Sequence, residues 1–126
     1  MLETGLKGLQ TEIVTKEKTA MEMGSGTLPV YATPAMIALM EKTAMISVAD
    51  ELSEDEATVG TKLEISHLAA CGIGAQIKCE STLTEIDRKR LVFEVQAFDG
   101  ETLIGKGIHE RFIINTVKFM DKVNNK

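Results

Sequence analysis

The residues of this sequence best suited to chemistry are Thr33, Glu41 and His67. Thr33 precedes a proline, where its hydroxyl can cap a helix or face a reacting group. Glu41 lies within an apolar run, and burying an unpaired carboxylate costs several kcal/mol. A histidine with a pKa near neutrality can take a proton from a hydroxyl or from water. Together the three types can form a nucleophile, a base and a group that orients the base.

Each of these residues also has a purely structural interpretation. Thr33 can be a plain N-cap, and Glu41 can form an ion pair with Lys42 or Arg111. His67 can be a hydrogen-bonded core residue. Eight residues separate Thr33 from Glu41, and that length of regular helix rises about 12 Å. The sequence leaves open whether the helix entry curls, whether His67 and solvent bridge the two, or whether they serve sites in different subunits.

A long helix must carry the threonine and the glutamate. The sequence predicts this helix from about Pro34 to Leu52, with Glu41 and Lys42 as the only charges before Ala49. A helix that is apolar nearly all round is usually enclosed by other structure. The amides near its start have no partners within the helix. Near Pro34 and Ala35 these amides could stabilise an oxyanion, so both residues are candidate substrate-binding positions.

Strands account for most of the remaining chain. Weak alternation predicts a first strand over residues 6–17, and a connection over residues 18–32 leads to the helix. Period-two patterns then predict four strands in a meander, beginning near Ala57, Ala75, Leu91 and Thr102. These elements predict one α+β domain over residues 1–126. Because one sheet covers only one side of a helix, we expect strong sheet curvature or a dimer that completes the burial.

The strand after the helix carries the histidine. Alternate residues from Val59 to His67 share one strand face, so the imidazole points where apolar side chains point. Gly60 permits a bulge or a close backbone approach. In the last strand His109 and Arg111 share a face, but no Cys/His cluster accompanies them. We therefore predict no metal site.

Composition excludes several classes of function. A net charge of −5 argues against a nucleic-acid surface, which needs clustered lysines and arginines. No apolar run is long enough to span a bilayer, and the first residues contain no secretory segment. We therefore expect a cytoplasmic protein with neither nucleic acid nor membrane as a partner. Cys71 and Cys79 lack the spacing of a disulfide framework, and we expect reduced, semi-buried thiols.

Taken in order, the motifs of this chain resemble the thioesterases of the hot-dog fold, and specifically the fluoroacetyl-CoA thioesterase branch. The resemblance covers about residues 28–123. Its Thr-to-Glu spacing of eight and Glu-to-His spacing of twenty-six agree with that family. It is carried by Tyr31-Ala32-Thr33, Leu39-Met40-Glu41, Ile65-Ser66-His67-Leu68-Ala69-Ala70, Ala97-Phe98-Asp99-Gly100 and Gly107-Ile108-His109-Glu110-Arg111.

This resemblance implies a hot-dog domain, a homodimer with its active site at the subunit interface, and hydrolysis of an acyl-CoA thioester without a cofactor. It leaves open whether two dimers pair into a tetramer. Residue by residue, the resemblance implies that Thr33 is the nucleophile or positions a water molecule, that His67 is the general base, and that Glu41 is the carboxylate that orients or activates His67. The family's matches to Gly60 and Arg111 lie beside the substrate, so both are candidate binding positions.

The connection over residues 18–32 departs from the fluoroacetyl-CoA branch. The specialised enzymes use phenylalanines there as a lid, whereas this segment contains none. We therefore expect a general short- or medium-chain acyl-CoA substrate. The alternative function is a non-hydrolytic module that binds acyl-CoA or another apolar ligand. A hydratase or dehydratase would need an Asp to pair with His67, and residues 57–75 contain none.

Overall fold

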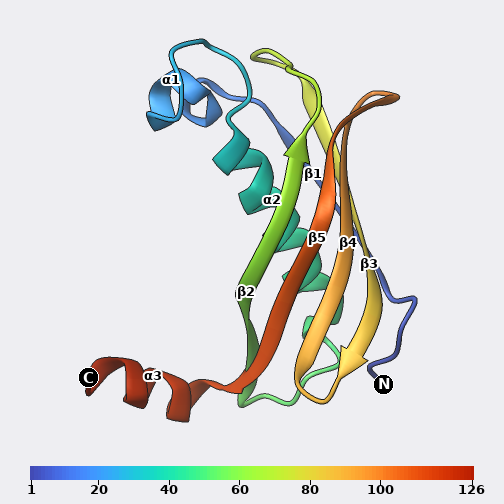
Figure 1. Cartoon of the computed structure of the whole chain (residues 1–126), viewed down its shortest axis with the longest axis vertical. Helices are drawn as coiled ribbons and strands as arrows, with labels where there is room; N and C mark the ends of the chain where they lie inside the picture. The colour runs from blue at the N-terminus through green and yellow to red at the C-terminus, as the bar shows by residue number, and fades with distance from the viewer.

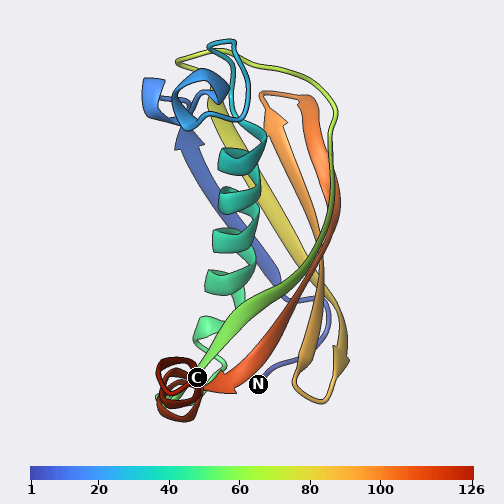
Figure 2. The same ribbon diagram turned by 60° about the vertical axis from the view of Figure 1, so that its left-hand side comes forward.

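A curved antiparallel sheet packs along one side of a long helix in the computed structural model, which describes residues 1–126 (Figure 1). The strands are β1 Lys7–Ile13, β2 Glu56–His67, β3 Gln76–Asp87, β4 Arg90–Asp99 and β5 Thr102–Asn115. The helices are the 3-10 turn η1 Lys16–Lys18, α1 Ala20–Met23, the long α2 Thr33–Ala49 and α3 Thr116–Asn124. Figure 2 shows α2 on the concave side of the sheet and α3 projecting from its lower end. No helix is long and apolar enough to cross a membrane.

The strand order is β1-β3-β4-β5-β2, so the predicted four-strand meander is wrong. Only β3, β4 and β5 follow one another as hairpins, and β2 pairs with β5 at the edge of the sheet. The hairpins turn at residues in the left-handed region, Arg88 with φ 58° and Gly100 with φ 61°. The connection over residues 68–75 is longer than a hairpin turn, although it contains a turn at Gly74 with φ 94°. It crosses the end of the sheet, which leaves β2 with one unpaired edge.

The helix α2 buries one face against the sheet. Its buried residues recur at helical spacing: Ala35, Met36, Leu39, Met40, Thr43, Ala44 and Val48. On the opposite face Met45 and Ile46 are each 41% exposed. The helix is therefore covered on one side only, and it ends at Ala49 rather than near Leu52. The uncovered apolar side chains are consistent with the expectation that a second copy completes the burial.

A bulge between Gly60 and Lys62 changes which residues of β2 face the helix. Upstream of it Thr58 is buried, whereas Val59 pairs with the exposed Phe112 on the outer face. The expectation that one face runs from Val59 to His67 is therefore wrong before the bulge. The extra residue shifts the alternation by one.

The strand β1 crosses α2 at a glycine. A Cβ at Gly8 would lie 2.8 Å from the Thr43 carbonyl oxygen, 2.8 Å from Ser47 Cβ and 2.5 Å from Ser81 Oγ. We expect Gly8→Ala to lower the free energy of unfolding by about 1–3 kcal/mol, because the helix backbone cannot move aside freely. Urea denaturation measures the loss. Gly72→Ala, which meets nothing within 4 Å, is the control, and an equal loss in both variants would contradict the close packing.

Candidate active site

Thr33 and His67 meet where α2 begins and β2 ends. Thr33 Oγ1 lies 2.7 Å from His67 Nδ1. The N-cap of α2 is Ala32, whose backbone is extended and whose side chain makes no capping bond. The interpretation of Thr33 as the N-cap is therefore wrong. Thr33 is instead the first residue of the helix, and its hydroxyl contacts the imidazole.

The imidazole of His67 is held in its neutral form. Burial lowers its pKa below the ordinary value of 6.5, and the backbone of Ala69 opposes this to a smaller extent. Nε2 is shielded from solvent and has no hydrogen-bond partner. With Nδ1 unprotonated, His67 can accept the proton of the Thr33 hydroxyl.

A buried polar network fixes the segment that leads into α2. The Tyr31 hydroxyl donates to Glu12 on β1, and Lys18 forms an ion pair with the same carboxylate. Burial and the neighbouring carboxylate raise the pKa of Tyr31. The Tyr31 amide also donates to the Cys71 carbonyl at 2.8 Å. These contacts tie the start of α2 to β1 and to the connection that follows β2.

Glu41 belongs to a second cluster, farther along α2. Its Oε2 lies 3.7 Å from Arg111 Nη1, and a Cβ at Gly60 would lie 2.8 Å from that oxygen. No hydrogen bond joins Glu41 to Thr33 or His67 within the chain. The structure therefore divides the predicted site residues into a Thr33–His67 pair and a cluster of Glu41, Gly60 and Arg111.

Arg111 is a buried cation with a fixed side chain. Its Nε donates to Thr58 Oγ1 at 2.8 Å and its Nη2 to the Thr58 carbonyl at 2.9 Å. Nη1 lies 3.1 Å from Nε2 of His109, which is fully buried. Burial lowers the pKa of Arg111, and Glu41 opposes the shift. Sequence reasoning considered His109 only as a metal ligand, although its i,i+2 spacing from Arg111 places both on one strand face.

The family described as fluoroacetyl-CoA-specific thioesterase, FlK, matches residues 14–117. The chain belongs to this family. The fluoroacetyl-CoA thioesterase of Streptantibioticus cattleyicolor is 36% identical over 97 residues, which are 77% of this chain and 70% of that protein.

Solved structures agree with this assignment. One of the fluoroacetyl-CoA thioesterase FlK superposes with a TM-score of 0.93 at 30% identity, over 100% of this chain and 98% of the other. A Thermus thermophilus thioesterase superfamily member gives 0.90 at 26% identity, over 98% and 92%. The predicted hot-dog fold and the predicted class of thioester hydrolase are confirmed.

In this FlK-family chain the connection to α2 folds into η1 and α1. Thr19 caps α1 by accepting from the Glu22 amide, and Gly24, with φ 79°, ends it. Figure 1 shows α1 at the same end of the molecule as the start of α2 and the end of β2. The exposed apolar side chains of this segment are methionine and leucine rather than phenylalanine: Met21, Met23 and Leu28.

The two remaining predicted binding positions directly follow the threonine. Pro34 occupies the first turn of α2 and is exposed, whereas Ala35 is buried. A regular helix leaves the amides of its first turn without intrahelical acceptors. Free amides of this turn would lie beside the Thr33–His67 pair, where an oxyanion could form.

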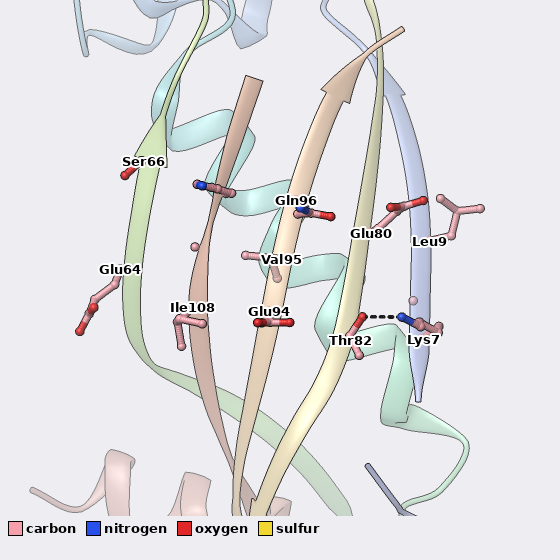
Figure 3. Close-up of a pocket in the computed structure, with 13 residues that line it drawn as sticks. Lys7, Leu9, Glu64, Ser66, Glu80, Thr82, Glu94, Val95, Gln96 and Ile108 are labelled. Atoms are coloured by element: carbon pink, nitrogen blue, oxygen red, sulfur yellow. Dashed lines mark hydrogen bonds between the residues drawn. The ribbon is translucent and has the colours of Figure 1, made fainter. Parts of the chain in front are cut away.

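A broad polar hollow lies elsewhere, on the open face of the sheet (Figure 3). All five strands contribute to it, and three carboxylates line it: Glu64, Glu80 and Glu94. Lys7 donates to Thr82 at 3.0 Å along its edge. The hollow contains none of the predicted site residues, so it is separate from the candidate active site.

Proposed function

We propose that this protein hydrolyses a short- or medium-chain acyl-CoA to the free acid and CoA. The observation that carries the proposal is the 2.7 Å contact between Thr33 Oγ1 and His67 Nδ1 in a chain of this family. His67 takes a proton from the attacking group, which is the Thr33 hydroxyl or a water molecule that this hydroxyl positions. The attack forms a bond to the thioester carbon, and the Ala35 amide in the first turn stabilises the oxyanion, since Pro34 has no N–H and can only contact the substrate through its ring. The C–S bond then breaks, and CoA leaves as the thiol with the proton that His67 took up. Where Thr33 itself attacks, its acyl ester is then hydrolysed by a water molecule that His67 deprotonates, which releases the free acid.

The proposed acyl group is not specifically fluorinated. The relative from Streptantibioticus cattleyicolor is named for fluoroacetyl-CoA. In this chain, flexible methionines, Met21 and Met23, take the place of rigid aromatic side chains in the segment before α2. Methionine adapts to apolar groups of different shape. A range of small unbranched acyl groups is therefore the better match.

We further propose that two chains form a homodimer whose active sites lie at the subunit interface. The unpaired edge of β2 offers a template for a second strand. Leu63 on β2 is 40% exposed, and Met45 and Ile46 on α2 are each 41% exposed. Because Glu41 does not meet Thr33 and His67 within one chain, we infer that a complete site combines Glu41 of one subunit with the Thr33–His67 pair of the other.

We expect sedimentation to give a species of twice 13.7 kDa, or four times that mass if dimers pair.

A site shared between two subunits also predicts complementation between two inactive variants. Glu41→Gln and His67→Ala chains, mixed under conditions that exchange subunits, should regain up to about a quarter of wild-type activity, because half the dimers are mixed and each has one intact site. Recovery would not occur if each site came from a single chain.

The carboxylate of Glu41 is expected to contribute to catalysis rather than to folding. Glu41→Gln keeps the shape of the side chain and removes its charge. We expect kcat to fall about 10- to 100-fold with the midpoint of urea unfolding nearly unchanged. Glu54→Gln, on an exposed carboxylate just beyond α2, is the matched control. Strong stabilisation with full activity would instead show that the Glu41 carboxylate has no catalytic role.

A further inference from the structure

We propose that His109 is a positioning residue, whose neutral imidazole in the Nδ1–H tautomer holds the Arg111 guanidinium toward Glu41. The effect of this role on turnover rests on the proposed function of Glu41. His109 lies on the inner face of β5 and is fully buried.

The partners of the imidazole determine its tautomer. Nδ1 lies 2.9 Å from the Lys62 carbonyl oxygen, which can only accept a hydrogen bond, so Nδ1 must carry the proton. Nε2 lies 3.1 Å from Arg111 Nη1, which can only donate. Nε2 must therefore be the unprotonated acceptor. The bulge of β2 at Gly60–Lys62 lies opposite this part of β5, so the same irregularity that changes the facing residues also supplies the carbonyl.

The imidazole completes a three-point attachment of the guanidinium. Thr58 accepts from Nε and Nη2, and His109 accepts from Nη1. With these three bonds made, the plane of the guanidinium is fixed and Nη1 lies 3.7 Å from Glu41 Oε2. Without His109 only Nε and Nη2 of the guanidinium would be bonded, both to Thr58, and Nη1 could turn away from the Glu41 carboxylate.

The three side chains converge over one glycine. A Cβ at Gly60 would lie 2.8 Å from Glu41 Oε2, 3.3 Å from His109 Cε1 and 3.4 Å from Arg111 Nη1. The backbone of β2 thus approaches all three groups, and a side chain at this position would displace the Glu41 carboxylate. This packing is independent of the hydrogen bonds and places His109 in the same cluster as the carboxylate.

Protonation would abolish the role of His109. A proton on Nε2 would replace the acceptor by a donor and set a second cation against Arg111. Burial and Arg111 lower the pKa of His109, whereas the Lys62 carbonyl, Glu41 and Glu110 oppose the shift. The Lys62 ammonium itself pairs with Glu64 and Glu110 on the solvent side. His109 is therefore neutral at pH 7, as the assigned tautomer requires.

The tautomer can be observed directly, because the chain has only two histidines. In ¹⁵N-histidine-labelled protein, a long-range ¹H–¹⁵N spectrum distinguishes a protonated ring nitrogen from a bare one. His67→Ala removes one set of signals and so assigns the other to His109. We expect a protonated Nδ1 and a bare Nε2 at pH 7. An Nε2–H tautomer or an imidazolium would overturn the proposal.

Kinetics separate positioning from simple filling of the core. With butyryl-CoA as the probe, we expect His109→Leu to lower kcat about 10- to 100-fold with little change in KM, since a small misplacement of a catalytic group has effects of this size. His109→Gln, whose amide can accept from Arg111, should restore most of the loss. Phe93→Leu is the packing control, because its ring lies 6.3 Å from the imidazole and outside the hydrogen-bond network.

The outcomes distinguish this proposal from the proposed function. Wild-type kcat in His109→Leu beside a slow Glu41→Gln would overturn the positioning role alone. Wild-type kcat in both variants would overturn the catalytic role of Glu41, and the positioning role with it. An equal loss of kcat in Phe93→Leu, or no rescue by His109→Gln, would reduce His109 to a core residue. If His109→Leu fails to fold, His109→Gln and the wild-type spectrum still decide between these outcomes.

Discussion

His67→Ala is expected to lower kcat for acyl-CoA hydrolysis by at least about 100-fold, the usual scale for loss of a general base. In the proposed mechanism the imidazole takes the proton, and Thr33 Oγ1 lies 2.7 Å from its Nδ1. Steady-state release of CoA, trapped by a thiol reagent, measures the loss. Ser66→Ala, an exposed neighbour on the opposite face of β2, should leave kcat unchanged. An unchanged rate in His67→Ala would remove His67 from the mechanism.

The same imidazole determines the acid limb of the pH profile. A base must be unprotonated, and burial lowers the pKa of His67 below 6.5. The contribution of His67 to kcat is therefore fully present at pH 7 and is lost as the pH falls through the lowered pKa. An acid limb centred above 6.5 would contradict a buried, neutral base.

The largest effect on stability is expected from Arg111→Leu. This change removes a buried cation and leaves the Thr58 carbonyl, His109 Nε2 and Glu41 without their partner. We expect the free energy of unfolding to fall by about 2–5 kcal/mol, because the Thr58 carbonyl and His109 Nε2 are left buried without a donor, at about 1–3 kcal/mol each. Glu41, whose side chain is 39% exposed, can be solvated by water instead. Guanidinium denaturation monitored by circular dichroism measures the loss of unfolding free energy.

The control for Arg111→Leu is an arginine on the neighbouring strand. Arg90 pairs with Glu85 and Glu110, but its side chain is 36% exposed. Solvent screens such pairs, so Arg90→Leu should lower the free energy of unfolding far less than Arg111→Leu. Similar losses of unfolding free energy in the two variants would show that the burial of Arg111 does not increase its contribution to stability.

Local patterns predict the elements of this fold but not their pairing. The proline after Thr33 and the apolar run from Met36 indicate α2, and Asp99-Gly100 indicates the β4–β5 turn. The pairing of β2 with β5 depends on contacts far apart in the sequence, which periodicity does not report. Periodicity does not report the bulge at Gly60 either, and its extra residue puts Val59, before the bulge, on the face opposite to Leu63, Ile65 and His67.

The candidate site shows the same division between local and tertiary information. Residue types identify Thr33, Glu41 and His67 as unusual, because a hydroxyl, a carboxylate and an imidazole occupy largely apolar surroundings. Thr33 was placed at the N-cap because the cap and the first helical residue are adjacent and equally suited to it. Glu41 lies beside Arg111 rather than His67 because of the position at which the sheet passes along α2. That position is set by tertiary packing, which local sequence does not report. No sequence motif marks the hydrogen bond of His109, because its partner is a backbone carbonyl.

Two observations on the helix and the edge strand connect the fold to the proposed assembly. The sheet covers one face of α2, so Met45 and Ile46 stay exposed in one chain. The proposed catalytic groups Thr33 and Glu41 lie at the start and in the middle of that helix. A second copy paired along β2 would cover the exposed side chains of α2 and bring Glu41 of one subunit to the Thr33–His67 pair of the other. Complementation between chains tests this shared site directly, whereas the mass of the particle reports only that a dimer forms.

The central claim is that this chain turns over acyl-CoA thioesters. Thiol release should be measured for the wild-type protein on a panel from acetyl- to decanoyl-CoA, with fluoroacetyl-CoA included and binding of each substrate measured in parallel. We expect turnover of the short- or medium-chain substrates, with no special preference for fluoroacetyl-CoA over acetyl-CoA. Tight binding without thiol release across the whole panel, in folded protein, would contradict the claim and identify a non-hydrolytic binding module.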